Sequence, residues 1–207
     1  MSVRKYWVAI SVGIALVAAG PAFAAYKYMQ KGKTVAVGKS ELVVTPPIDW
    51  NKLPGPIGRN AESWTLDGLP LNDVTFYGGV ADTQTLFREV DKKNRPLPRF
   101  SATMLTTDVA DLLEGSYRIA LGTPLFEVTS LEPATFAGQP GFRFTYSFTA
   151  TGDEVKRQGE ALGAIIDKRL FLATYEAPAM YYFAKDADKF RALAASAAID
   201  PKKKKKK

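Results

Sequence analysis

Hydrophobic and polar side chains alternate most regularly over residues 142–148, where four aromatic residues alternate with Arg143, Thr145 and Ser147. Successive side chains of a strand point to opposite faces of its sheet, so this pattern predicts a strand with one aromatic face in the core. Other runs rich in apolar and β-branched residues predict further strands. They lie at residues 42–45, 63–66, 73–77, 126–131, 155–166 and 170–175.

A longer period predicts two helices. Over residues 107–120 the apolar side chains recur at helical spacing, and Asp108 falls in the first turn, where a carboxylate favours the helix dipole. Residues 186–199 form a second apolar-faced segment that ends before Pro201. Strands, a helix, a strand meander and a last helix together predict an α+β domain in which an antiparallel sheet is flanked by helices.

Residues 1–26 carry the pattern of an export signal or a membrane anchor. Arg4 and Lys5 precede a long apolar stretch that ends in the small-residue pattern Ala22-Phe23-Ala24, which is typical of a signal peptide cleaved after Ala24. The apolar run is also just long enough to span a bilayer as an N-terminal hydrophobic helix. Both alternatives place the domain outside the cytoplasm, on the periplasmic side of the inner membrane.

The rest of the chain is predicted to have basic ends and an acidic body. Residues 27–39 are predicted to be a basic linker, residues 40–200 the globular α+β domain, and residues 201–207 a disordered tail. The chain has 28 basic and 21 acidic residues, but twelve of the basic residues lie before residue 40 or in the tail. The body is therefore acidic, which disfavours nucleic-acid binding through a basic face.

The sequence contains no cysteine and no histidine. These absences exclude disulfides, thiolate and imidazole catalysis, and nearly every zinc or copper site. No catalytic residue, cofactor or metal site is predicted.

Three side chains are candidates for contact with a partner. Trp50 follows a strand that ends at two prolines, where a Trp either lines a ligand groove or packs over the edge of the core. Arg95 and Arg99 lie in a basic loop that contains prolines. A guanidinium offers a planar fork of donors to a carboxylate or phosphate, although such a loop can also be merely solvated.

The chain ends in six consecutive lysines: Lys202, Lys203, Lys204, Lys205, Lys206 and Lys207. Near anionic lipid headgroups each lysine contributes roughly 1 kcal/mol, so the run predicts an electrostatic contact with a membrane surface. A solubilising tail without a specific partner is the alternative.

The order of elements resembles the α/β/α sandwich shared by PsbP, the extrinsic protein of photosystem II, and the bacterial DcrB-like envelope proteins. The resemblance is carried by residues 43–50, a strand followed by prolines and Trp50, and by residues 138–142, which lead into a long hairpin and a short helix. Residues 50–53 and 175–178 also resemble segments of alphaproteobacterial cell-envelope proteins. The resemblance covers residues 40–200 and implies a non-enzymatic accessory or binding role, without transferring any active-site residue.

The leading hypothesis is therefore a non-enzymatic accessory or interaction domain held at the membrane, acting within an envelope protein complex. One alternative is a protein that binds a lipid or small apolar molecule in a pocket between sheet and helix. Another is a hydrolase that uses the carboxylates Asp108, Asp111 and Glu114, which share one helix flank.

Overall fold

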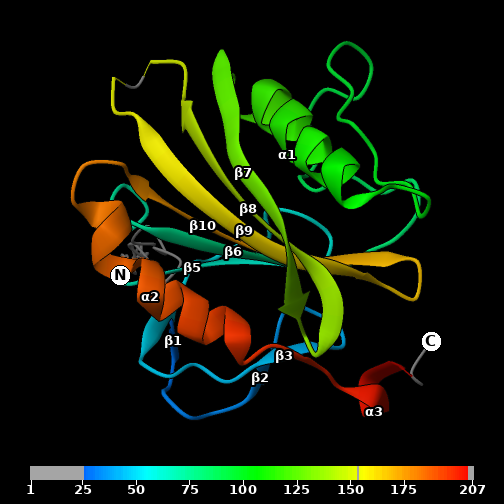
Figure 1. Cartoon of the computed structure of the whole chain (residues 1–207), viewed down its shortest axis with the longest axis vertical. Helices are drawn as coiled ribbons and strands as arrows, with labels where there is room; N and C mark the ends of the chain where they lie inside the picture. The colour runs from blue at the N-terminus through cyan, green and yellow to red at the C-terminus, as the bar shows by residue number, and fades with distance from the viewer. Residues whose placement is uncertain (1–25, 153, 205–207) are drawn as a thin grey trace, which may run out of the picture.

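One large antiparallel sheet organises the fold (Figure 1). The computed structural model describes residues 26–152 and 154–204. Neighbouring strands pair in an order that differs from their order in the chain. Across the sheet they are β1 (Lys27–Met29), β4 (Trp50–Lys52), β5 (Ala61–Thr65), β6 (Asp73–Val80), β10 (Arg169–Pro178), β9 (Arg157–Ile166), β8 (Gln139–Thr149) and β7 (Leu125–Phe136).

Two helices cover opposite faces of this sheet. In Figure 1, α1 (Thr106–Ala120) and α2 (Tyr182–Ala195) lie on opposite sides of the band of strands. Along β10, Leu170 and Leu172 pack in the core beneath α1, whereas Phe171 and Tyr175 pack in the core beneath α2. The period of two in this strand thus supplies both cores, and the result is an α/β/α sandwich.

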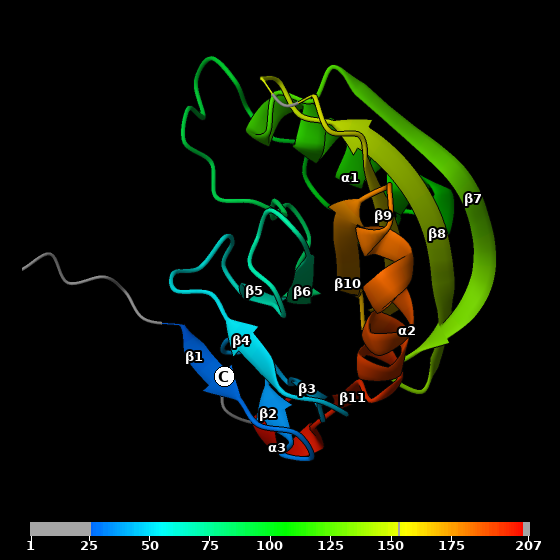
Figure 2. The same cartoon turned by 90° about the vertical axis from the view of Figure 1, so that its left-hand side faces the viewer.

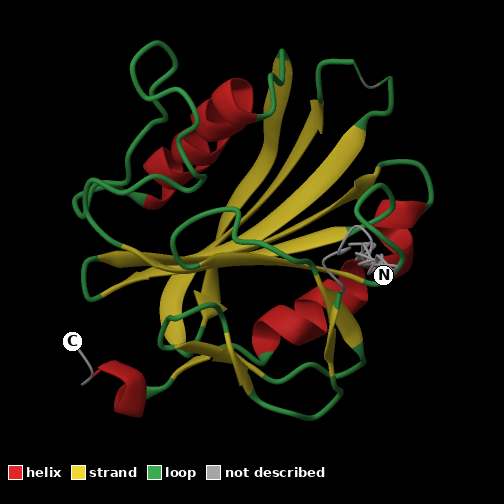
Figure 3. Ribbon diagram, turned by 180° about the vertical axis from the view of Figure 1, so that it is seen from behind, coloured by secondary structure: helices red, strands yellow, loops and turns green. Residues whose placement is uncertain are grey.

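A smaller antiparallel sheet closes one end of the domain. Its order is β11 (Ala198–Ile199), β3 (Leu42–Val44) and β2 (Val35–Ala36), and one helical turn, α3 (Pro201–Lys204), follows it. Figure 2 shows these elements gathered near β1, while β7 and β8 arch over the other side of the curved main sheet. Figure 3 shows the long connection between β6 and α1 lying beside α1.

The predicted fold class is confirmed, and the sheet has the predicted aromatic strand. Phe142, Phe144, Tyr146 and Phe148 of β8 are all buried on the face that α1 covers. The first predicted helix coincides with α1 to within a residue at its start.

The prediction for the last helix is wrong at both ends. α2 begins at Tyr182, and it ends at Ala195, so the chain can pair as β11 with β3. Ser196 supports this ending because its hydroxyl donates to the Leu193 carbonyl (2.6 Å) and accepts from the Thr45 amide (2.9 Å). Propensity favoured continuing the helix, but strand pairing across the domain prevailed.

The segments outside the predicted domain have structure where they are described. Residues 27–39, predicted as a linker, contribute β1 to the main sheet and β2 to the smaller one. The first four residues of the predicted tail form α3. The proposed signal or anchor lies outside the described residues. Within residues 26–152 and 154–204, no helix is long and apolar enough to span a bilayer.

A buried charge network fastens α2 to the sheet. Glu160 of β9 has a fully buried side chain, and it accepts hydrogen bonds from Arg143 of β8 (2.8 Å) and Arg191 of α2 (2.8 Å). Burial acts to raise the pKa of Glu160, but the hydrogen bonds and charges of the two arginines outweigh it and hold that pKa below its usual value. Glu132 of β7 also pairs with Arg143, but its side chain is 53% exposed.

We expect Glu160→Gln to lower the free energy of unfolding by about 3 kcal/mol, because two arginines lose a buried anion. Since the folded-state pKa is lowered, this stabilisation is present at neutral pH and is lost as the pH falls through that pKa. Urea denaturation at neutral and acidic pH measures both effects. The control Glu132→Gln should cost less than about 1 kcal/mol, and an equal cost for both variants would contradict the assignment.

Candidate functional site

A pocket of about 660 Å³ opens between α1, the loops beside it and the strands β5, β6 and β10. Its walls are apolar and come mostly from loops and from the end of α1. They include Leu53, Ile57, Leu69, Phe87, Leu97 and Leu121. The floor is polar and comes from strands: it includes Ser63, Asp73, Thr75, Tyr77 and Glu176, with Tyr117 of α1 beside them.

The sheet register places the polar floor together. Asp73, Thr75 and Tyr77 alternate along β6 and therefore share one face of the sheet. Glu176 of β10 is the direct cross-strand partner of Asp73, and Ser63 of β5 is that of Thr75. The two carboxyl groups are thus neighbours in the sheet, where like charges destabilise the pairing.

Glu176 is held by two tyrosines. Its Oε1 accepts hydrogen bonds from the hydroxyls of Tyr117 and Tyr146, the latter at 2.6 Å. Burial raises the pKa of Glu176, while the two tyrosine donors act in the opposite direction. Burial and the nearby Glu176 raise the pKa of both tyrosines well above 10, so they remain donors at physiological pH.

Asp73 is the second carboxyl of the floor. It is half-buried, and Thr75 Oγ1 lies 3.4 Å from its Oδ2, with Ser63 Oγ 2.6 Å from Thr75 Oγ1. Burial, followed by the charge of Glu176, raises the pKa of Asp73 to about 7. Within the described part of the chain, neither Asp73 nor Glu176 forms an ion pair, so the carboxyl groups are not neutralised by a contacting cation.

Tyr77 completes the floor with an unused hydroxyl. Its side chain is 1% exposed, and its oxygen has no hydrogen-bond partner among the residues that the structure describes. A buried polar group without a partner costs free energy, and such groups are uncommon in folded proteins. The Tyr77 hydroxyl therefore has unused hydrogen-bonding capacity beside the two carboxyl groups.

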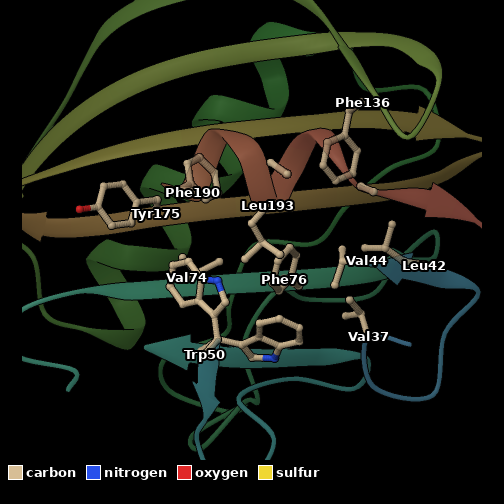
Figure 4. Close-up of a cluster of buried hydrophobic side chains, with 14 of the residues drawn as sticks. Val37, Leu42, Val44, Trp50, Val74, Phe76, Phe136, Tyr175, Phe190 and Leu193 are labelled. Carbon is tan, nitrogen blue, oxygen red and sulfur yellow. The ribbon is translucent and has the colours of Figure 1, made fainter. Parts of the chain in front are cut away.

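Of the residues predicted to contact a partner, only Arg95 lines this pocket. Arg95 is exposed at the rim and donates to the Ile119 carbonyl near the end of α1. Arg99 instead pairs with Glu89 (2.9 Å) and donates to the Thr83 carbonyl (2.7 Å). Trp50 is 1% exposed and packs in the core beneath α2, among the buried residues drawn in Figure 4. This core lies on the opposite face of the sheet from the pocket.

The three helix carboxylates considered for hydrolysis do not converge. Asp108 accepts from the Leu105 amide (2.8 Å) at the start of α1, Glu114 pairs with Arg118 (2.6 Å), and Asp111 is exposed. The described residues contain no group of three or more side chains suited to hold a metal ion. Lys202 is exposed on α3, and the structure does not describe the side chains of the five lysines that follow it.

Asp73, Glu176, Tyr77 and Tyr117 were not predicted as site residues from the sequence. A signal for Glu176 was present, because it is the one charged residue in the mainly apolar segment 170–177, and an acid there is either buried itself or exposes its apolar neighbours. The pairing of Glu176 with Asp73 could not be predicted from the sequence, because it depends on the register of β6 against β10.

Comparison with known proteins shows the fold. No protein-family model matches the sequence, and no curated protein is significantly similar to it. Among solved structures, cyanobacterial PsbP (CyanoP) from Synechocystis sp. PCC 6803 is similar at 15% identity and a TM-score of 0.50, over 87% of this chain and 95% of that one. The fold is therefore PsbP-like.

Two other structures match with lower scores. A Bacteroides thetaiotaomicron protein has 9% identity and a TM-score of 0.48, over 82% of this chain and 49% of that one. LpqN, described as involved in cell envelope biogenesis of Mycobacterium tuberculosis, has 12% identity and a TM-score of 0.35, over 85% and 91%.

We expect Asp73→Asn to stabilise the protein at about pH 8. In the unfolded chain Asp73 loses its proton above about pH 4, whereas in the folded protein it keeps the proton up to about pH 7. Between these pH values the folded state binds more protons than the unfolded state, so the free energy of unfolding falls as the pH rises. Asparagine does not titrate, and it should increase the free energy of unfolding by up to about 4 kcal/mol at that pH.

Urea denaturation of both proteins at about pH 5 and about pH 8 measures this difference, which should be larger at the higher pH. Asp91→Asn at the rim is the control, because hydrogen bonds from Asn94 lower the pKa of Asp91 and no gain is expected. A gain for Asp73→Asn that does not depend on pH would contradict the assignment.

Proposed function

We propose that this chain is a non-enzymatic binding domain of the cell envelope that holds a small, largely apolar molecule in the pocket beside α1. The observation that carries the proposal is the pocket itself. Its volume of about 660 Å³ lies within the usual range for small-molecule sites, and its apolar walls with a few polar groups on the floor are typical of them.

The chemistry of the floor supports binding over catalysis. The chain has no histidine or cysteine, and the hydroxyls around the carboxyl groups belong to tyrosines with raised pKa values and to serine or threonine without an imidazole base. Tyr117 and Tyr146 already direct their protons at Glu176. These groups are arranged to orient a ligand.

The proposed location in the envelope rests on the sequence at both ends. The basic and apolar pattern of residues 4–24 supports export or anchoring, and the lysine run supports contact with anionic headgroups. We propose that the domain lies on the periplasmic side of the inner membrane, where it serves as an accessory component of an envelope protein complex.

Filling the pocket should abolish ligand binding. Ala120 lines the pocket near the end of α1 and is exposed, so Ala120→Trp can place a large side chain there without disturbing the core. Titration with the neutral apolar fluorophore N-phenyl-1-naphthylamine should show at least about tenfold weaker binding than for the parent protein, since 1.4 kcal/mol of lost contact is tenfold in affinity.

The matched control is Ala184→Trp, which introduces the same residue at an exposed position of α2, on the other face of the sheet. It should bind the fluorophore as the parent protein does. Equal binding by all three proteins would place the fluorophore outside this pocket, and absence of binding to the parent protein would count against the proposed function.

Replacing Lys202–Lys207 with serine in the full chain should reduce its recovery with membranes at low salt, because each lysine near an anionic surface contributes roughly 1 kcal/mol. Membrane fractionation measures the change, and the intact mass of the same sample shows whether residues 1–24 have been removed. If both proteins keep residues 1–24 and are recovered equally with membranes after a carbonate wash, the N-terminal segment and not the lysine run holds the protein at the membrane.

A further inference from the structure

The floor of the pocket is acidic although its surroundings are apolar. Asp73 and Glu176 lie directly opposite each other on β6 and β10, and both line the cavity. Burial raises the pKa of both carboxyl groups, and the charge of Glu176 raises that of Asp73 further. A cation placed between them would relieve both costs.

The basic residues near the pocket do not fill this role. Arg88 and Arg95 line it at exposed positions, and Arg95 is engaged with the Ile119 carbonyl. Arg157 of β9 donates to the carbonyls of Pro70 (3.0 Å) and Leu69 (3.4 Å). The charge of Arg157 favours the ionised forms of Asp73 and Glu176, although Arg157 forms no ion pair with either of them among the described residues.

Two further features of the floor suit a cationic group. The unused hydroxyl of Tyr77 is an independent sign of a missing polar partner, because it is buried among the same residues. The rings of Tyr77, Phe87 and Tyr117 also form a chain of edge-to-face contacts, with centroids 6.2 and 5.5 Å apart. Aromatic faces attract a desolvated ammonium group.

We infer that the pocket selects ligands with an ammonium group on an apolar body, the ammonium lying between Asp73, Glu176 and the Tyr77 hydroxyl and the apolar body against the walls. This inference rests on the proposed function and adds the chemical class of the ligand to it. A carboxylate ligand would bring a third negative charge to the floor. A neutral ligand would leave both carboxyl groups without a counter-ion.

The affinity for an ammonium ligand should depend on pH. The titratable and charged groups around the floor are Asp73, Glu176, Tyr77, Tyr117 and Tyr146, with Arg157 beside it and Asp91, Arg88 and Arg95 at the rim. The pKa of Asp73 is about 7, so an ammonium ligand must displace a proton from it at lower pH. Affinity should therefore fall about tenfold between about pH 8 and about pH 6.

The test compares three probes of one chain length, octylammonium, 1-octanol and octanoate, by calorimetry with the full chain at these two pH values. Octylammonium should bind at least about tenfold more tightly than 1-octanol at the higher pH and lose that advantage at the lower one. The affinity for 1-octanol should not change with pH, and octanoate should bind most weakly.

Asp73→Asn should bind 1-octanol as the parent protein does, which shows that the variant is folded and its pocket open. It should have lost both the preference for octylammonium and its pH dependence, whereas Asp188→Asn, at an exposed position of α2 on the other face of the sheet, should retain them. Equal or tighter binding of 1-octanol or octanoate by the parent protein would overturn the inference and leave the proposed function standing. Failure of all three probes to bind would count against both.

Discussion

The arrangement of this domain depends on the burial of both faces of one antiparallel sheet. Because side chains alternate along β10, Phe171 and Tyr175 reach the core beneath α2 and Leu172 reaches the core beneath α1. Glu176 belongs to the second series, so the same alternation that builds the core places a carboxyl group at a buried position. The site is therefore a consequence of the strand period, and it needs no specialised loop to position its acids.

The sequence revealed those elements whose pattern is local. β8 and α1 were predicted because aromatic alternation and helical spacing are visible within a dozen residues. Trp50, considered as a partner contact, lies in a core that draws on residues far apart in the chain. Asp73 and Glu176 could not be found together for the same reason: their proximity is set by strand register, which no short segment encodes.

The pocket illustrates a balance between stability and binding. Among the described residues, the two acids of the floor form no ion pair and the Tyr77 hydroxyl has no hydrogen-bond partner, and both features cost folding free energy. The domain carries them on a sheet that is secured elsewhere, by the aromatic cores and by the network of Glu160 with Arg143 and Arg191. Groups that weaken the folded chain are often the ones retained for contact with another molecule.

The strand β1 has a mechanical consequence for a chain attached to a membrane. β1 is hydrogen-bonded to β4 at the edge of the main sheet, so the structured domain begins within a residue or two of position 26. If residues 1–26 remain in a bilayer, almost no linker separates the lipid from the first strand of the sheet. The domain would then be held close to the lipid headgroups, with little freedom to move away from them.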